Sequence, residues 1–156
     1  MNRWASWCRR ALVGASVTWA AALPLATYTA SRPQIGAGPY VFALAVYMVG
    51  GAVCHQRDER SFHLWAHQMP VCARCAGIYA GAAVGALIAA ARLMRSSRPR
   101  APQRRWRTLL VSAAVPAAAT LVFEWTTGIM PGNALRAATG VVLGAAVAWL
   151  VVYEVN

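Results

Sequence analysis

The stretch PVCARCAGIYAGAAVGALIAAARL, residues 70–93, decides how the rest of the chain is organised. Between Arg74 near its start and Arg92 near its end it carries no charged residue. A helix crosses a bilayer with roughly 20 predominantly apolar residues, and this stretch has that length. Proline suits the first turn of a helix, so we expect a transmembrane helix that opens at Pro70 and runs to about Leu93.

Further apolar blocks surround this segment, at about residues 11–30, 39–53, 108–127 and 134–152. The chain is 59% hydrophobic and only 12% charged, which leaves too little polar surface for a soluble domain. We therefore expect an all-α fold, an integral membrane helical bundle of about five transmembrane helices. The whole chain, residues 1–156, would form this single domain.

The first block also resembles the core of a secretory signal peptide. Arg9 and Arg10 precede it, as basic residues precede a signal core. However, Tyr28 stands where a cleavage site needs a small residue, and the apolar run is longer than a usual signal core. We expect a retained helix, whereas cleavage would leave four spans.

Glycines recur every fourth residue in two of the expected helices. Gly77, Gly81 and Gly85 follow this spacing in one helix. Gly140 and Gly144 repeat it in the last. Small residues at this spacing form a groove in which another helix, from the same or a second copy of the chain, can come close. The alternative is that the glycines reflect a composition rich in alanine and glycine.

All of the chain's basic residues are arginines, and seven of them lie between residues 92 and 107. Beside membrane spans, such a loop marks the cytoplasmic side and touches anionic lipid, so we expect no nucleic-acid partner. With five spans, this loop shares its side with the turn at 31–38, giving eight arginines against five on the other side. The positive-inside rule then predicts a multi-pass protein of the plasma (inner) membrane with residues 54–69 on its outer face.

The connection before the third helix gathers the chain's metal-binding side chains. Residues 53–79 hold three of the four cysteines and all three histidines. Thiolates and neutral imidazoles are the ligands that zinc prefers, and a tetrahedral site takes four of them. A helical hairpin would bring Cys54, at the end of the second span, close to Cys72 and Cys75 at the start of the third. We expect a zinc site, with iron or no metal as alternatives.

Three histidines compete for the fourth ligand position, namely His55, His63 and His67. The N-terminus of a helix lowers the pKa of a nearby thiol, and Arg74 acts in the same direction, which favours the thiolate that binds a metal. The alternative is inert packing, because cysteine is a common buried residue.

The motif CHQRDERSFHLWAHQMPVCARCAGIYAG closely resembles the signature of a family of small predicted membrane proteins of bacteria and archaea, catalogued as domain of unknown function 2085. The matching residues are Cys54, His55, Gln56, Arg60, Ser61, Phe62, Pro70, Cys72, Arg74, Cys75, Gly77, Ile78, Tyr79 and Gly81. NALRAATG, residues 133–140, resembles the family's second motif. The resemblance covers about residues 40–152, with the motif region at 54–81. It implies a multi-span membrane protein and brings no established activity, and His63 matches no fixed position.

Arg74, Glu124 and Arg136 are charged residues that lie near the ends of the expected spans. A charge in lipid is costly and usually has a partner, so we expect Glu124 to pair with Arg74 or Arg136 beside the metal site. The alternative is that the arginines extend unpaired to the interface. Family members often have an aspartate where this chain has Glu124. Gln56 would orient a metal ligand through a hydrogen bond.

Two classes of function fit these residues. The first is a membrane metal site, either structural with four protein ligands or Lewis-acidic with three and a water. The second is a thiol–disulfide oxidoreductase in which Cys72 and Cys75 exchange electrons with a quinone and Cys54 relays to a partner. A third reading is a non-catalytic scaffold whose metal braces the hairpin. The sequence assigns no catalytic residue and leaves open whether the protein is an enzyme.

Overall fold

The structure is a computed structural model that describes residues 3–32, 36–95 and 103–155. The helices in these ranges are α1 (Arg3–Ala30), α2 (Ala37–Val53), α3 (Ala73–Arg95), α4 (Gln103–Thr127) and α5 (Asn133–Glu154). A short 3-10 turn, η1 (Asp58–Arg60), and a two-stranded antiparallel hairpin, β1 (Ser61–Leu64) and β2 (His67–Cys72), connect α2 to α3. The expected all-α membrane bundle is confirmed, with one small hairpin added.

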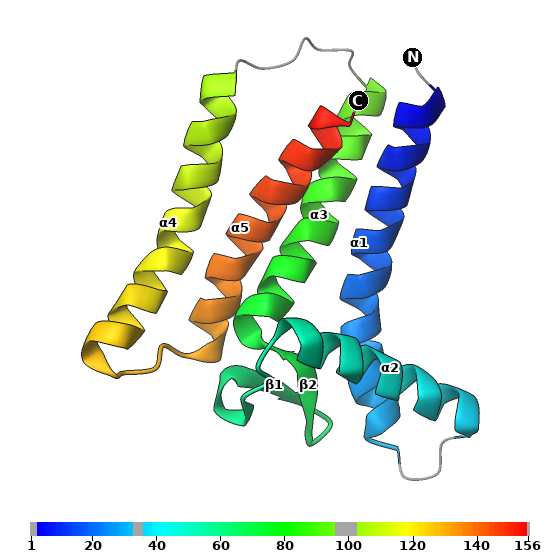
Figure 1. Ribbon diagram of the computed structural model, residues 1–156, viewed down its shortest axis with the longest axis vertical. Helices are drawn as coiled ribbons and strands as arrows, with labels where there is room; N and C mark the ends of the chain where they lie inside the picture. Colours follow the sequence, from blue (N-terminus) through cyan, green and yellow to red (C-terminus); the bar gives the residue numbers. More distant parts are fainter. Residues whose placement is uncertain (1–2, 33–35, 96–102, 156) are drawn as a thin grey trace.

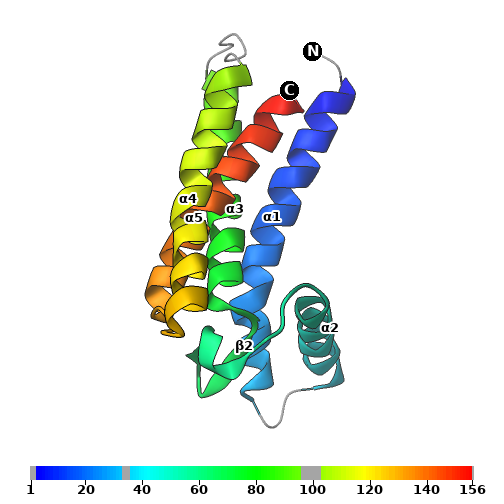
Figure 2. The same ribbon diagram turned by 60° about the vertical axis from the view of Figure 1, so that its left-hand side comes forward.

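Four helices run side by side along the long axis of the molecule, and one lies across their end (Figures 1 and 2). Helices α1, α3, α4 and α5 contain apolar stretches long enough to cross a membrane, whereas α2 is a shorter apolar helix of 17 residues. Together, α2 and the hairpin cover the end of the bundle where α3 and α5 begin (Figure 1). The apolar block expected over residues 39–53 thus forms the fifth helix, but it is shorter than the other four and runs across the end of the bundle.

This arrangement changes which chain segments share an end of the molecule. Helix α1 ends at the hairpin end of the bundle, and α3 begins there (Figure 1). Helix α2, which connects them, stays at this end. The start of α1, the end of α3 and the start of α4 consequently lie at the same end, opposite the hairpin (Figure 2). The sequence-based expectation had placed the N-terminus and the arginine-rich segment on opposite sides. Residues 96–102 of that segment lie outside the described residues.

Helices α3 and α5 run parallel and make the most extensive contact between any two elements. A Cβ atom added to Gly81 would overlap the carbonyl oxygen of Val141, and one added to Gly144 would overlap that of Ile78. The same close approach to the partner helix occurs at Gly77, Gly85 and Gly140. The glycine spacing therefore forms the predicted groove, and the helix that occupies it is α5 of the same chain.

The start of α3 differs from the sequence-based expectation. Pro70 belongs to strand β2, and the helix begins at Ala73. The strands pair Ser61 with Cys72 and Leu64 with His67, so the chain still forms ladder contacts up to the cysteine. Cys72 is consequently the last strand residue, and Cys75 lies in the first turn of α3.

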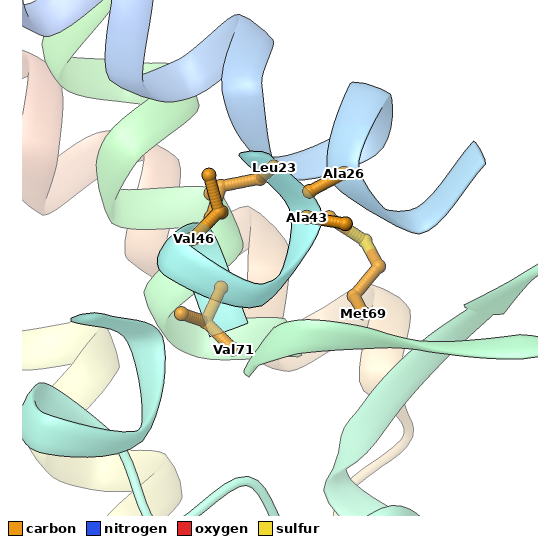
Figure 3. Close-up of a cluster of buried hydrophobic side chains, with 6 residues drawn as sticks. All are labelled: Leu23, Ala26, Ala43, Val46, Met69 and Val71. Atoms are coloured by element: carbon orange, nitrogen blue, oxygen red, sulfur yellow. The ribbon is translucent and has the colours of Figure 1, made fainter. Parts of the chain in front are cut away.

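A buried apolar cluster joins α1, α2 and β2 at the hairpin end. Figure 3 shows its side chains, which are Leu23, Ala26, Ala43, Val46, Met69 and Val71. Nearer the start of α1, the ring of Trp19 meets that of Tyr79 on α3 edge to face, with centroids 5.9 Å apart. These contacts fix α2 and β2 against the upright helices and thereby set where the cysteines lie.

Candidate metal centre

The structure brings three cysteines from three elements to one point. Cys54 caps the C-terminus of α2, Cys72 ends β2 and Cys75 lies in α3. Their sulfur atoms all lie within 4.8 Å of one another. The backbone N–H of Cys72 donates a hydrogen bond to Sγ of Cys54 (3.2 Å), which joins the end of α2 to the end of β2.

Gln56 holds the backbone around this cluster. Its side-chain amide donates to the carbonyl oxygens of Tyr47 (2.9 Å) and Pro70 (2.7 Å), so it links α2 to β2. The Gln56 backbone has a φ of 45°, in the left-handed region that non-glycine residues rarely adopt. Gly50 allows the close approach, because a Cβ there would overlap the Pro70 carbonyl oxygen. Gln56 therefore positions the segments that carry the cysteines.

The three histidines lie in three different parts of the structure. His55 is exposed and lines the same cavity as the three cysteines. His67 lines a separate cavity between α1 and α2, together with Tyr40. His63 is exposed, and its Nε2 lies 2.8 Å from Oδ1 of Asp58. Of the predicted imidazole ligands, the structure places only His55 beside the sulfur cluster.

The surroundings of Cys72 favour its thiolate. The pKa of Cys72 is lowered, mainly because the Cys75 thiol donates a hydrogen bond to it. Burial opposes this effect, while the backbone N–H groups of Cys75 and Arg74 and the Cys54 thiol add to it. These N–H groups belong to the first turn of α3, where helix termini stabilise negative charge.

A buried carboxylate lies between two arginines from distant parts of the chain. Glu124 of α4 contacts Arg136 of α5 (2.8 Å) and Arg60 of η1 (2.7 Å). The side chains of Glu124 and Arg136 are only 6% and 3% exposed. The expected pair of Glu124 with Arg136 is present, whereas Arg74 instead donates to the hydroxyl of Thr120 (3.0 Å).

Three residues of this region were not predicted from the sequence. Arg60 and Thr120 had no expected role, and Asn133 was not expected to contact the first motif. The side-chain amide of Asn133 donates to the carbonyl oxygen of Ser61 (3.0 Å), which ties the start of α5 to β1. The only signal was that Arg60, Ser61 and Asn133 fall within the two family-like motifs.

The cysteine cluster faces a cavity of about 320 Å³. The cavity is lined by the three cysteines, His55, Gln56, Val53, Arg57, Arg60 and Arg74. Around one tetrahedral zinc ion, sulfur atoms at about 2.3 Å from the metal are about 3.8 Å apart. Because the three sulfurs already lie within 4.8 Å of one another, small side-chain movements suffice to hold such an ion.

Comparison with known proteins identifies relatives of unknown activity. A family described as "Predicted membrane protein (DUF2085)" matches residues 54–150. An uncharacterized protein of Methanocaldococcus jannaschii is 48% identical over 46 residues, which are 30% of this chain and 30% of that protein. An uncharacterized protein of Methanothermobacter thermautotrophicus is 53% identical over 30 residues, which are 19% of this chain and 27% of that protein. The alignments thus span less than a third of these curated relatives, and no solved structure matches the chain.

Proposed function

The chain belongs to the family of predicted membrane proteins whose signature covers residues 54–150, and we propose that it binds one zinc ion at the hairpin end of its helix bundle. The observation that carries this proposal is the convergence of the Cys54, Cys72 and Cys75 sulfurs within 4.8 Å. Thiolates are strong zinc ligands, and a site that draws them from α2, β2 and α3 would hold these elements together.

The fourth ligand decides which kind of zinc site this is. His55 follows Cys54 directly and lines the same cavity, so it is our candidate for a closed, structural site. A water molecule in that position would instead make the ion a Lewis acid facing the cavity. A His55→Ala variant that keeps its zinc would favour the open site.

Metal analysis of the purified protein tests the proposal. We expect about one zinc ion per chain in detergent, measured by inductively coupled plasma mass spectrometry together with free thiols. Serine substitution of Cys54, Cys72 or Cys75 should each abolish zinc binding, because it leaves at most three of the four ligands that a closed site needs, two of them thiolates. Cys8→Ser is the matched control, since Cys8 lies on α1 outside the cluster. Equal zinc content in the Cys54→Ser and Cys8→Ser proteins would exclude the site.

The distribution of arginines supports an orientation for the protein in the plasma membrane. Three arginines near the start of α1, two in the last turn of α3 and three near the start of α4 give eight at the end opposite the hairpin. The other arginines of the described residues are Arg32, Arg57, Arg60, Arg74 and Arg136. By the positive-inside rule, this arginine-rich end faces the cytoplasm and its anionic lipids, and the cysteine cluster lies at the outer face.

Reporter fusions test this orientation, because the C-terminus of α5 lies at the arginine-rich end (Figure 1). A green fluorescent protein fused after residue 156 should fluoresce, and an alkaline phosphatase fused there should be inactive. The opposite pair of signals would place the cysteine cluster on the cytoplasmic side.

Thiol–disulfide exchange with a quinone is the second candidate function. The hydrogen bond between the Cys75 and Cys72 thiols favours it, and Cys54 is close enough to relay to a partner. Oxidation of the two thiols to a disulfide would release two electrons and two protons, which reduce the quinone to a quinol. In the metal assay above, this function predicts no zinc and a Cys72–Cys75 disulfide that re-forms when quinone is added.

A further inference from the structure

The cavity beside the cysteine cluster is lined by three arginines and by no acidic residue. Arg57 precedes η1, Arg60 ends it, and Arg74 lies in the first turn of α3. They line the same cavity of about 320 Å³ as the three cysteines. Such a concentration of guanidinium groups at the edge of a helix bundle is typical of a site for an anionic group.

The charges of the groups around this cavity do not cancel. Glu124 is shared between Arg60 and Arg136, so it neutralises one of these two arginines. Among the described residues, no carboxylate pairs with Arg57 or Arg74. If three thiolates held one Zn²⁺ ion, the cluster would carry a single negative charge. Arg57 and Arg74, which have no carboxylate partner in the described part of the chain, then leave a surplus of at least one positive charge in the cavity.

Two of these arginines also retain unused donors. Arg60 uses a terminal nitrogen on Glu124, and Arg74 uses a terminal nitrogen on Thr120. The Nε atoms of both are buried and have no hydrogen-bond partner among the described residues. Buried donors are costly to leave unpaired, so a side-chain movement that brings either Nε to an acceptor in the cavity would be favourable.

We propose that the cavity formed by Arg57, Arg60 and Arg74 beside the cysteine cluster binds a phosphate group. A phosphate offers several acceptor oxygens and up to two negative charges, which match the unpaired donors and the surplus charge. The cavity is lined by residues from the end of α2 to the start of α3. These segments lie at one end of the four upright helices (Figure 2), where either a phospholipid headgroup or a soluble phosphate compound can reach them. The site depends on the arginines and does not require the metal.

Binding measurements on the delipidated full-length protein in detergent test this site. One arm titrates inorganic phosphate and follows binding by isothermal titration calorimetry. The other titrates phosphatidic acid and counts bound lipid by native mass spectrometry. Arg57→Gln and Arg74→Gln should each weaken binding at least about tenfold, because each removes a charged hydrogen bond. Arg92→Gln is the matched control, since Arg92 lies at the other end of α3 and stacks on Trp149.

The two arms distinguish the source of the phosphate. Saturable binding of phosphatidic acid alone assigns the cavity to a lipid headgroup, and binding of inorganic phosphate assigns it to a soluble ligand. No saturable binding in either arm overturns the proposal, as does an Arg92→Gln protein that loses as much affinity as Arg57→Gln. Zinc is measured on the same samples, so that loss of phosphate binding with zinc retained separates this proposal from the metal site.

Discussion

At the scale of single residues, Glu124 links three segments that are distant in the sequence. It joins α4 to Arg136 of α5 and to Arg60 of the connection before the hairpin. A buried arginine without its carboxylate leaves an uncompensated charge in a poorly solvated position. The side chain of Glu124 therefore controls the stability of the hairpin end.

Replacing Glu124 by glutamine should destabilise the protein by about 3–5 kcal/mol, since Arg136 then remains buried and unpaired. Thermal unfolding in detergent measures the effect. Glu59→Gln, on the exposed surface of η1, is the control and should change stability by less than about 0.5 kcal/mol.

The double variant Glu124→Gln/Arg136→Gln makes this prediction specific. It should recover part of the lost stability, because the unpaired charge is gone. Glu124→Asp should keep most of the stability, since it preserves the charge. Equal melting temperatures for the Glu124→Gln and wild-type proteins would show that the ion pair contributes nothing.

Cys72 should be the most reactive cysteine of the cluster once metal is removed. Its pKa is lowered in the folded protein, so its thiolate persists at pH values at which an ordinary cysteine is already protonated. We expect iodoacetamide to alkylate Cys72 of the folded, metal-free protein at neutral pH, and the rate to fall only in more acidic solution. In the unfolded protein the same residue should react at a lower rate at neutral pH. Peptide mass spectrometry of the two samples would contradict the prediction if Cys72 reacted equally in both.

At the scale of elements, the contact between α3 and α5 sets the architecture of the bundle. The two helices approach so closely at their glycines that no side chain fits between their backbones. In lipid, where apolar side chains gain little by leaving solvent, such close packing is a main source of helix association.

A single methyl group tests this contact. Gly81→Ala should destabilise the protein by about 1–3 kcal/mol, because the new Cβ overlaps the backbone of α5. Gly14→Ala is the matched control, since Gly14 also lies in a helix but has open space around it. It should leave stability unchanged or raise it by up to about 1 kcal/mol, the usual gain of alanine over glycine in a helix. Similar effects of both substitutions on thermal unfolding would show that the contact is looser than described.

The elements that the sequence predicted correctly are those with strong apolar periodicity and length. The four long helices and the glycine groove were all read from composition and spacing. The hairpin was missed because its two-residue turn, Trp65 and Ala66, takes left-handed φ angles of 53° and 61° without glycine or asparagine. The crosswise course of α2 was missed because a short apolar block has the same composition whether it spans the bilayer or covers the end of a bundle.

At the scale of the whole molecule, the proposed zinc site and the α3–α5 contact stabilise different parts. The zinc ligands come from the ends of α2, β2 and α3, whereas the glycine contacts continue along α3 and α5 away from the hairpin. Removal of metal should therefore loosen one end of the protein and leave the rest intact.

Hydrogen–deuterium exchange measures this division. After treatment with a zinc chelator, we expect faster exchange in peptides covering residues 50–72 and unchanged protection in those covering residues 77–90. Loss of protection throughout the chain would mean that the metal stabilises the entire bundle. Unchanged exchange in both regions would mean that no metal holds the hairpin.

The composition of the site was predictable only where neighbours in space are also close in sequence. Cys54, Cys72 and Cys75 lie within one short connection, and their spacing already predicted that they meet. By contrast, Arg60 and Glu124 are brought together by the packing of α4 and α5, which no local pattern encodes. His67 opens β2 and lies at the cavity between α1 and α2, away from the cysteine cluster. This position likewise depends on the course of the strand.

The bond from Asn133 to Ser61 has a practical consequence for anyone who wishes to transplant this centre. A synthetic peptide of residues 54–75 would contain all three cysteines of the cluster, yet it would lack the hydrogen bond from Asn133 that holds its loop. A portable version must also carry the stretch from Thr120 to Arg136, which supplies both the amide anchor and the counter-charge. The smallest transferable unit is thus two separate pieces of chain.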